Sequence, residues 1–278
     1  MSARPAPRRG RSRTFTIART DLRQLAQSPD FWAPMLVLAL LFFVVVPAIL
    51  LIVLVRLPEE GVAASVSTAL DLLPQQAQTR VLGATPVDRT SYALAVYLFA
   101  PIAVIVPMTI STAIGANCLV GEREKGTGEW LAQTPATERE IYLGKLIASL
   151  LPGYLTTLVG FGLYSLLVNI VVGPRVGGWF FPTRDWWVLM LLVVPPFLAL
   201  TLSVVLRLSG RVRSAAAAQQ ASGLVTLPLI MLSYAQSSGA LFGTRSALAF
   251  AALAWLGATW GLVRGQRAVQ RSRLLGVD

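Results

Sequence analysis

The chain contains no histidine, a single cysteine and few charged residues, and each shortage excludes a class of function. Without histidine, the chain lacks the commonest metal ligand and the commonest general base. Its one cysteine, Cys118, excludes a disulfide within the chain and an iron–sulfur site built by the chain alone. No nucleophile–base pair or carboxylate cluster suggests an intramembrane enzyme. The sequence therefore predicts no catalytic residue, no metal site and no cofactor bound by this chain.

Charged residues make up only 13% of the 278 residues, whereas 55% are hydrophobic. Soluble domains carry about 25% charged residues, so this composition indicates a membrane protein. Six apolar stretches are long enough to cross about 30 Å of hydrocarbon. The six expected spans are 31–55, 91–120, 141–172, 186–206, 215–236 and 246–263. The predicted fold class is an all-α membrane protein with six transmembrane helices.

Basic residues concentrate on one side of these six spans. Most of the 24 lysines and arginines lie before the first span, in the second-to-third and fourth-to-fifth connections, and in the basic tail 264–278. Cytoplasmic segments carry such an excess, so both termini are expected in the cytoplasm. No charged residue lies near the middle of an expected span, where a charge costs about 2.5–3.5 kcal/mol and often marks ion coupling. A proton- or sodium-driven transporter is therefore disfavoured, and energy for transport would have to come from another chain.

The segment before the first span divides into two parts. Residues 1–13 are expected to form a disordered basic arm, and residues 14–30 an amphipathic helix on the inner membrane surface. Apolar side chains recur at helical spacing at Phe15, Ala18, Leu22 and Leu25, whereas Arg19 and Arg23 occupy another face. The alternative is that the whole segment is a disordered basic arm that only enforces topology.

An acidic, glycine-rich stretch, GEREKGTGEW, runs from Gly121 to Trp130 directly after the second span. The spacing of Gly121 and Gly126 matches the start of a Walker loop, G-x-x-x-x-G-K-[ST]. Thr127 stands where that loop requires lysine, and no strand precedes the stretch. The chain is therefore not expected to bind ATP through a Walker loop.

The same stretch offers an acidic surface at the inner end of the second span. Thr137-x-x-Glu140 forms a capping box that predicts the start of the third helix. The residues between, 127–134, are expected to form a short helix or turn held between two long helices. Such a segment suits docking to a partner protein, where charge pairs fix the register. The alternative is a solvated loop in which Glu122 and Lys125 merely pair three residues apart.

The longer stretch GEREKGTGEWLAQTPATEREIYLGKLIASLLPGYL resembles the permease subunits of type-2 ABC exporters. Their pattern is Gly-Glu-x-Glu, then Gly-Thr-Leu-Glu, a proline after a short helix, and Gly-Lys at the start of the third span. The matching positions are Gly121, Glu122, Glu124, Gly126, Thr127, Glu129, Pro135, Gly144 and Lys145. Gly128 departs from the pattern, because the family usually has leucine there. The resemblance extends to TIARTDLRQLAQSP before the first span and to AAAAQQASGLVTLPL in the fifth.

This resemblance implies a permease subunit without enzymatic activity of its own, in the bacterial plasma membrane. Two permeases, identical or homologous, would form the translocation path as a dimer, and two separate ABC ATPase subunits would bind ATP and Mg²⁺ beneath them. The loop 121–140 would contain the coupling helix that enters a cleft of the ATPase, and Arg19 and Arg23 would contact the ATPase and the membrane surface. The expected coupling residues are Gly121, Glu122, Glu124, Gly126, Thr127, Glu129, Trp130 and Leu131. Nucleic acid is not an expected partner.

A few polar residues within the spans are candidates for lining the path. They are Ser111, Asn117, Asn169, Gln219 and Gln220. The alternative is that these side chains form hydrogen bonds between helices. An otherwise apolar path favours a hydrophobic or amphipathic cargo. A competing interpretation of the whole chain is a membrane scaffold or assembly factor that docks a cytoplasmic partner but transports nothing.

Overall fold

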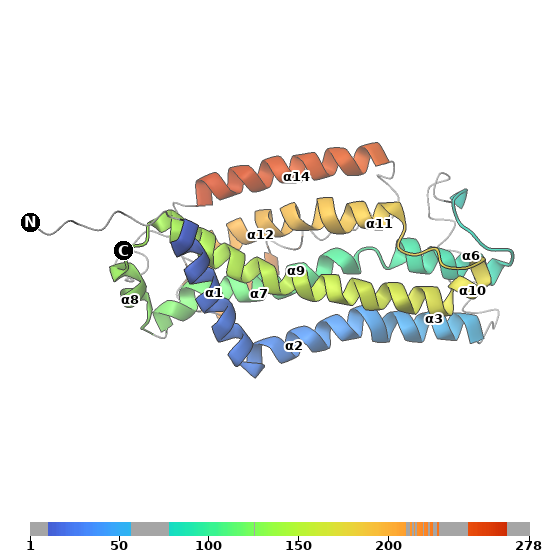
Figure 1. Ribbon diagram of the computed structural model, residues 1–278, viewed down its shortest axis with the longest axis horizontal. Coiled ribbons are helices and arrows are strands. Elements are labelled where there is room, and N and C mark those ends of the chain that lie inside the picture. The colour runs from blue at the N-terminus through green and yellow to red at the C-terminus, as the bar shows by residue number, and fades with distance from the viewer. Residues whose placement is uncertain are drawn as a thin grey trace, which may run out of the picture.

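The computed structural model describes residues 11–56, 78–124, 126–209 and 244–265, with isolated positions between 212 and 227. Every regular element within these residues is a helix, and the long helices lie side by side in an elongated bundle (Figure 1). Helices α1 (Arg11–Gln27) and α8 (Gly128–Gln133) lie at one end, called here the inner end. Helices α6 (Pro86–Ala93) and α10 (Gly173–Val176) lie at the opposite, outer end.

Four helical stretches are long and apolar enough to cross a membrane, and they coincide with the first four expected spans. They are Pro29–Arg56, Pro86–Glu122, Glu138–Val171 and Arg184–Ser209. The expected sixth span lies within the 22-residue helix α14 (Thr244–Gly265). The expected fifth span, 215–236, lies mainly outside the described residues, as does the tail after 265.

Three of the four stretches contain a π-helical turn ahead of a proline. The first stretch consists of α2 (Pro29–Leu40), the π-turn η1 (Leu41–Val45) and α3 (Val46–Arg56). The second consists of α6, the π-turn η2 (Leu94–Leu98) and α7 (Ile102–Glu124). The fourth consists of α11 (Arg184–Val188), the π-turn η3 (Leu189–Val193) and α12 (Val194–Ser209). Pro47, Pro101 and Pro195 follow these turns by two or three residues. Proline has no N–H and its ring collides with the carbonyl four residues earlier. The wider turn accommodates this clash without ending the span.

The turn before Pro101 leaves two backbone carbonyls without a helical donor. The Phe99 N–H donates to Leu94 O, and the Ala100 N–H donates to Tyr97 O. The carbonyls of Ala95 and Val96, which lie between these two acceptors in the chain, receive neither bond. Side chains from other helices donate instead. Tyr164 Oη donates to Ala95 O at 2.6 Å, and Trp186 Nε1 donates to Val96 O at 2.9 Å. Both buried carbonyls are thereby satisfied, as a protein interior in a membrane requires.

The third span is a single helix, α9 (Glu138–Val171), and it begins at the predicted capping box. The Glu140 N–H donates to Thr137 Oγ1 at 3.2 Å, and the Thr137 N–H donates to the Glu140 carboxylate at 2.7 Å. Pro152 lies inside α9 without breaking it. The sequence prediction of this helix start is confirmed.

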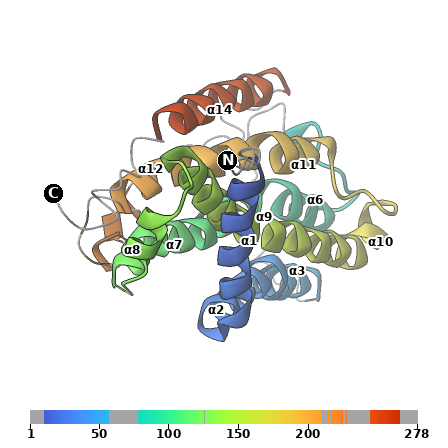
Figure 2. The same cartoon turned by 60° about the vertical axis from the view of Figure 1, so that its left-hand side comes forward.

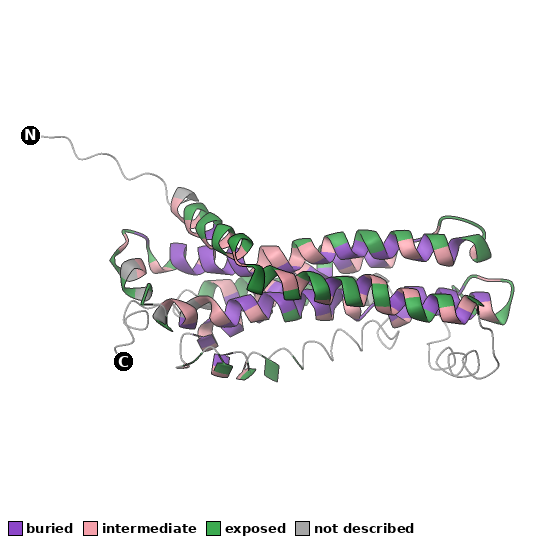
Figure 3. Ribbon diagram, turned by 90° about the horizontal axis from the view of Figure 1, so that it is seen from below, coloured by how far each residue is buried: buried purple, intermediate pink, exposed green. Residues whose placement is uncertain are grey.

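Helix α7 forms the centre of the bundle and packs against both α9 and α12, while α14 packs on α12. Most of the second span is buried, whereas only a minority of the residues in the first span, α2 to α3, are buried. Figure 3 shows exposed positions along the outward faces of the long helices and buried positions where the helices meet. Gly153 permits the close approach of α9 to α7, because a side chain there would overlap Ser111 and the carbonyl of Pro107. A displacement of α7 would therefore change the packing of α9 and α12 against it.

Candidate functional site

The segment that resembles the coupling region lies at the inner end, where α7 ends and α9 begins. Helix α8 connects them. It begins at Gly128, although the pattern that this segment resembles usually has leucine at that position. Its place agrees with the short helix expected within 127–134. Figure 2, which brings this end forward, shows α1 running across the end of the bundle, with α7 and α8 to one side of it. Four elements therefore meet here: α1, α7, α8 and α9.

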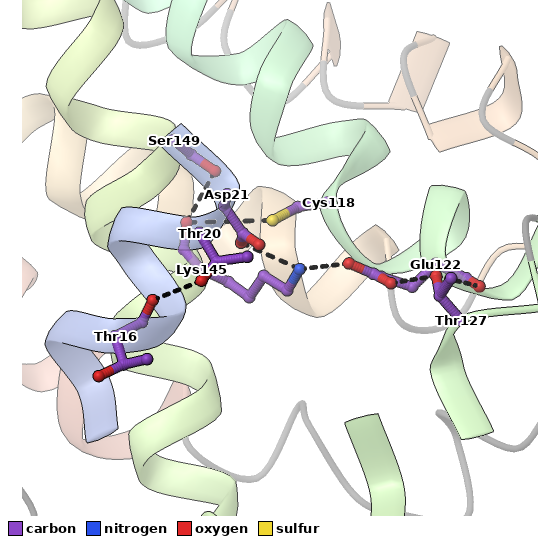
Figure 4. A network of polar contacts seen from close by, with 8 residues as sticks. All are labelled: Thr16, Thr20, Asp21, Cys118, Glu122, Thr127, Lys145 and Ser149. Carbon is purple, nitrogen blue, oxygen red and sulfur yellow. Dashed lines mark hydrogen bonds and ion pairs between the residues drawn. The ribbon is translucent and has the colours of Figure 1, made fainter. Parts of the chain in front are cut away.

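A buried lysine joins three of these elements. Lys145 Nζ, on α9, lies 2.6 Å from Glu122 Oε1 on α7 and 3.0 Å from Asp21 Oδ2 on α1 (Figure 4). Only 4% of the Lys145 side chain is exposed, against 15% for Asp21 and 21% for Glu122. We call Asp21, Glu122 and Lys145 the ion triad. It is the most deeply buried group of charges among the described residues.

The charges of the ion triad do not balance. One ammonium faces two carboxylates, so the fully ionised group carries a net negative charge. Burial raises the pKa of the Asp21 carboxyl above its usual range, although the neighbouring Lys145 acts in the opposite direction. Removing one partner from a buried ion pair costs about 3–5 kcal/mol, because the other charge remains buried without compensation. Lys145 is therefore the member on which the other two depend.

Glu122 also connects the ion triad to the start of α8. Thr127 Oγ1 donates to Glu122 Oε2, and the Thr127 N–H donates to the Glu122 carbonyl at 2.9 Å. Gly126 between them has φ +69°, in the left-handed region that favours glycine. The sequence predicted Glu122 as a contact to an ATPase, whereas the structure directs its carboxylate to Lys145 and Thr127.

Helix α1 lies directly on the start of α9. A Cβ atom at Gly144 would come within 2.8 Å of the Ile17 side chain and 3.1 Å of the Thr14 carbonyl, so glycine is required for this contact. Beyond it, Arg13 Nη1 donates to the carbonyl of Pro135 at 2.8 Å, in the connection between α8 and α9. Helix α1 begins at Arg11, so residues 11–13, expected in the disordered arm, are helical.

The two faces of α1 differ from the predicted grouping. Ala18 is buried, whereas Phe15, expected on the same apolar face, is 68% exposed. Arg19 and Arg23 are exposed, as expected for a face that meets a partner or the membrane surface. The face toward α9 is instead made by Thr14, Ile17 and Asp21, which lie three or four residues apart near Ala18.

The remaining predicted coupling residues lie around α8. Glu124, Gly126, Thr127 and Glu129 are exposed, and Leu131 packs against the small apolar cluster that contains Ile141 and Leu146. The Trp130 side chain lies outside the described part of the chain. Among the α8 side chains that the structure describes, Leu131 contacts the bundle and Glu129 is exposed.

The described candidates for path lining have different surroundings. Ser111 packs against Gly153, and Asn117 Nδ2 donates to the Ala113 carbonyl of its own helix at 2.9 Å. Asn169 binds the outer loop: Nδ2 donates to Phe181 O at 2.6 Å, and Oδ1 accepts from Phe180 N at 3.0 Å and Phe181 N at 3.1 Å. Gln220 is exposed, and Gln219 lies outside the described residues. Asn117 bonds within its own helix and Asn169 bonds a loop, whereas the alternative predicted hydrogen bonds between helices.

Sequence reasoning missed Asp21, although a signal was present. Asp21 is the only acidic residue before position 30, in a segment rich in arginine. It follows Ile17 by four residues and therefore shares its helix face. Among the residues that the structure describes, no group of His, Cys, Asp or Glu side chains could hold a metal ion.

Comparison with protein families identifies the chain. The model of the family described as ABC-2 family transporter protein matches residues 65–255, more than half of the chain. A search of curated proteins found no match. The matched range contains α7, α8, α9 and α12, and hence two members of the ion triad. The chain belongs to the ABC-2 transporter family and is a multi-pass membrane permease subunit.

Proposed function

We propose that the chain is the membrane-spanning subunit of an ATP-driven exporter, that it works as a dimer, and that it is coupled to a separate ATPase through residues 121–140. The observation that carries this proposal is the position of α8. It is a short helix that carries the exposed Glu129, follows the exposed Glu124 at the end of the central helix α7, and is joined at its other end to α9. Two further spans, 215–236 and 246–263, would complete six spans with both termini in the cytoplasm.

Force applied to α8 has a direct route into the bundle. Thr127 is bonded to Glu122 at the end of α7, and Glu122 is bonded to Lys145 on α9. Both long helices would therefore move when α8 is displaced. Because the second span, which contains α7, is the most buried of the four candidate spans, movement of α7 would alter packing in the core and change which side of the membrane the path faces.

The ATPase would be recognised mainly by charge. Glu124 and Glu129 are exposed beside α8, and Arg19 and Arg23 are exposed on α1. Complementary charges across an interface fix its register and accelerate association. ATP and Mg²⁺ would be bound by the two ATPase subunits, and the permease would supply the path.

The cargo would be hydrophobic or amphipathic. In the described spans, charged residues lie toward the ends of the helices, as Asp30 and Arg56 do in the first span. These spans therefore lack the central ionisable side chains that commonly mark an ion pathway. The plasma membrane of a bacterium is the proposed location.

The test is reconstitution of the chain with its ATPase in vesicles, comparing wild type with the double variant Glu124→Lys and Glu129→Lys. Reversal of both exposed charges is expected to abolish copurification of the ATPase and ATP-dependent transport, while the variant still inserts. Asp30→Lys is the matched control, because Asp30 is an exposed acid at the start of α2, away from α8.

Two results would contradict the proposal. One is undiminished transport by the double variant. The other is uphill transport by the chain alone, with no nucleotide-hydrolysing partner. An ATPase that binds and hydrolyses ATP without any transport would favour a membrane scaffold instead.

A further inference from the structure

We propose that Lys145 is a positioning residue that holds α1 and the coupling segment (residues 121–137) together as one mechanical unit. This inference rests on the proposed function, because it assigns a role to α1 in transmitting force from the ATPase. It predicts that the link from α1 to Lys145 is needed for transport and not for folding.

The first observation is that α1 is connected to both ends of the coupling segment. At the start of the segment, Glu122 and Asp21 share the Lys145 ammonium, at 2.6 Å and 3.0 Å. At its end, the Pro135 carbonyl accepts a hydrogen bond from Arg13 on α1 at 2.8 Å. Helix α8 lies between these two connections, so a rigid-body movement of α8 would pull on α1 at two points.

The second observation is the absence of space between α1 and α9. Gly144, directly before Lys145, brings the Ile17 side chain and the Thr14 carbonyl against the α9 backbone. Ala18 is buried in the same contact. Arg13, Thr14, Ile17, Ala18 and Asp21 therefore form a continuous face, and Lys145 provides the only ion pair to that face among the described residues.

The third observation is that the ion triad is a poor means of stabilisation. Buried ion pairs contribute little net stability, because desolvation of the charges offsets their attraction. Two carboxylates on one ammonium add repulsion to that cost. A second carboxylate does, however, connect a third helix to the same atom. The arrangement therefore favours connection over stability.

Asp21→Asn is the decisive variant. Asparagine keeps the shape of aspartate and leaves Lys145 and Glu122 as a balanced pair, so expression, thermal stability and copurification of the ATPase are expected to match wild type. Transport per ATP hydrolysed is expected to fall at least about fivefold, the lower end of typical coupling between sites. Arg264→Met, which removes an exposed cation at the inner end of α14, is the matched control and should leave that ratio unchanged.

Lys145 itself is tested by two substitutions. Lys145→Arg retains a cation that can reach both carboxylates and should keep most of the coupling. Lys145→Met should lose it, and if this variant fails to fold, Asp21→Asn still decides. Asp21→Asn with transport per ATP within twofold of wild type would overturn the inference while leaving the proposed function intact.

A distance measurement separates the inference from the function. Spin labels at Gln24 on α1 and Gln133 on α8, both exposed, are placed in the full chain with Cys118→Ala. With Asp21 present, a single narrow distribution of the label-to-label distance is expected both with and without ATP. With Asp21→Asn, this distribution should broaden at least about twofold, because α1 and α8 then move separately. Equal distributions would overturn the inference. Wild type without ATP-driven transport would overturn the proposed function, and the distances would still report whether α1 and α8 move together.

Discussion

The inner and outer ends of the bundle are both connected by buried polar side chains, but only the inner end joins its helices through a deeply buried group of charges. At the inner end, Lys145 joins three helices through full charges. At the outer end, the Asp88–Arg175 ion pair leaves 36% of the Arg175 side chain exposed, and the buried contacts of Asn169, Tyr164 and Trp186 are neutral hydrogen bonds to backbone atoms. Four aromatic rings, those of Phe161, Tyr164, Phe181 and Trp186, pack around these bonds.

This difference in buried polar contacts indicates different mechanical roles for the two ends. Hydrogen bonds to backbone atoms lose their partners as soon as the backbone shifts, so the outer end is suited to holding one arrangement. Long side chains with full charges keep an attraction over several ångströms of movement. The inner end can therefore stay connected while it moves, as transmission of force requires.

The largest effect is expected at the inner end, for Lys145→Met. It leaves two carboxylates buried together, and the free energy of unfolding should fall by about 3–5 kcal/mol. The measurement is the thermal unfolding midpoint of the purified protein in detergent. The triple variant with Asp21→Asn and Glu122→Gln removes the remaining charges and should recover most of the lost stability. Equal midpoints for Lys145→Met and wild type would show that the ion triad is not the buried network described here.

The corresponding change at the outer end is Asn169→Leu. It leaves the buried N–H of Phe181 without its partner, while the Phe181 carbonyl keeps only the Ser165 hydroxyl at 3.3 Å, and an unsatisfied buried group costs about 1–3 kcal/mol. Thermal unfolding should report this loss, whereas the protein that remains folded should keep its transport per ATP. A fall in transport per ATP would contradict the assignment of stability to the outer end and force transmission to the inner end.

The substitution Gly144→Ala tests the contact between α1 and α9. The added methyl group overlaps Ile17, and overpacking of this kind costs about 1–3 kcal/mol. Adding Ile17→Ala makes room and should recover both stability and transport, as measured by thermal unfolding and vesicle assays. If the second substitution fails to improve the first, α1 does not lie on α9 at this point.

The smallest effect is expected for Tyr164→Phe at the outer end. It removes the donor to Ala95 O, and hydrogen bonds between membrane helices average about 0.6 kcal/mol. A shift of the unfolding midpoint of a degree or two is expected, with no change in transport. Tyr154→Phe, which removes a partly buried hydrogen bond to Met190 O, is the matched comparison. A large transport defect in Tyr164→Phe would show that the outer end takes part in coupling.

Much of the fold was predictable because it depends on local patterns. Apolar runs predicted four spans that the structure contains, and Thr137 with Glu140 predicted the start of α9. The short helix after Gly126 followed from charge, glycine and proline placement. The π-helical turns were not predicted, because the prolines indicated kinks without specifying how the backbone would adapt.

The sequence by itself determined the membrane environment, the start of the third helix and the place of the exposed acidic segment, because composition and local spacing control these. Only the tertiary structure decided that Glu122 faces Lys145, that Asp21 completes the ion triad, and that Asn169 binds a loop. The physical reason is that a buried charge or amide selects its partner from whatever packing brings within about 3 Å, and that choice depends on helices far apart in the chain.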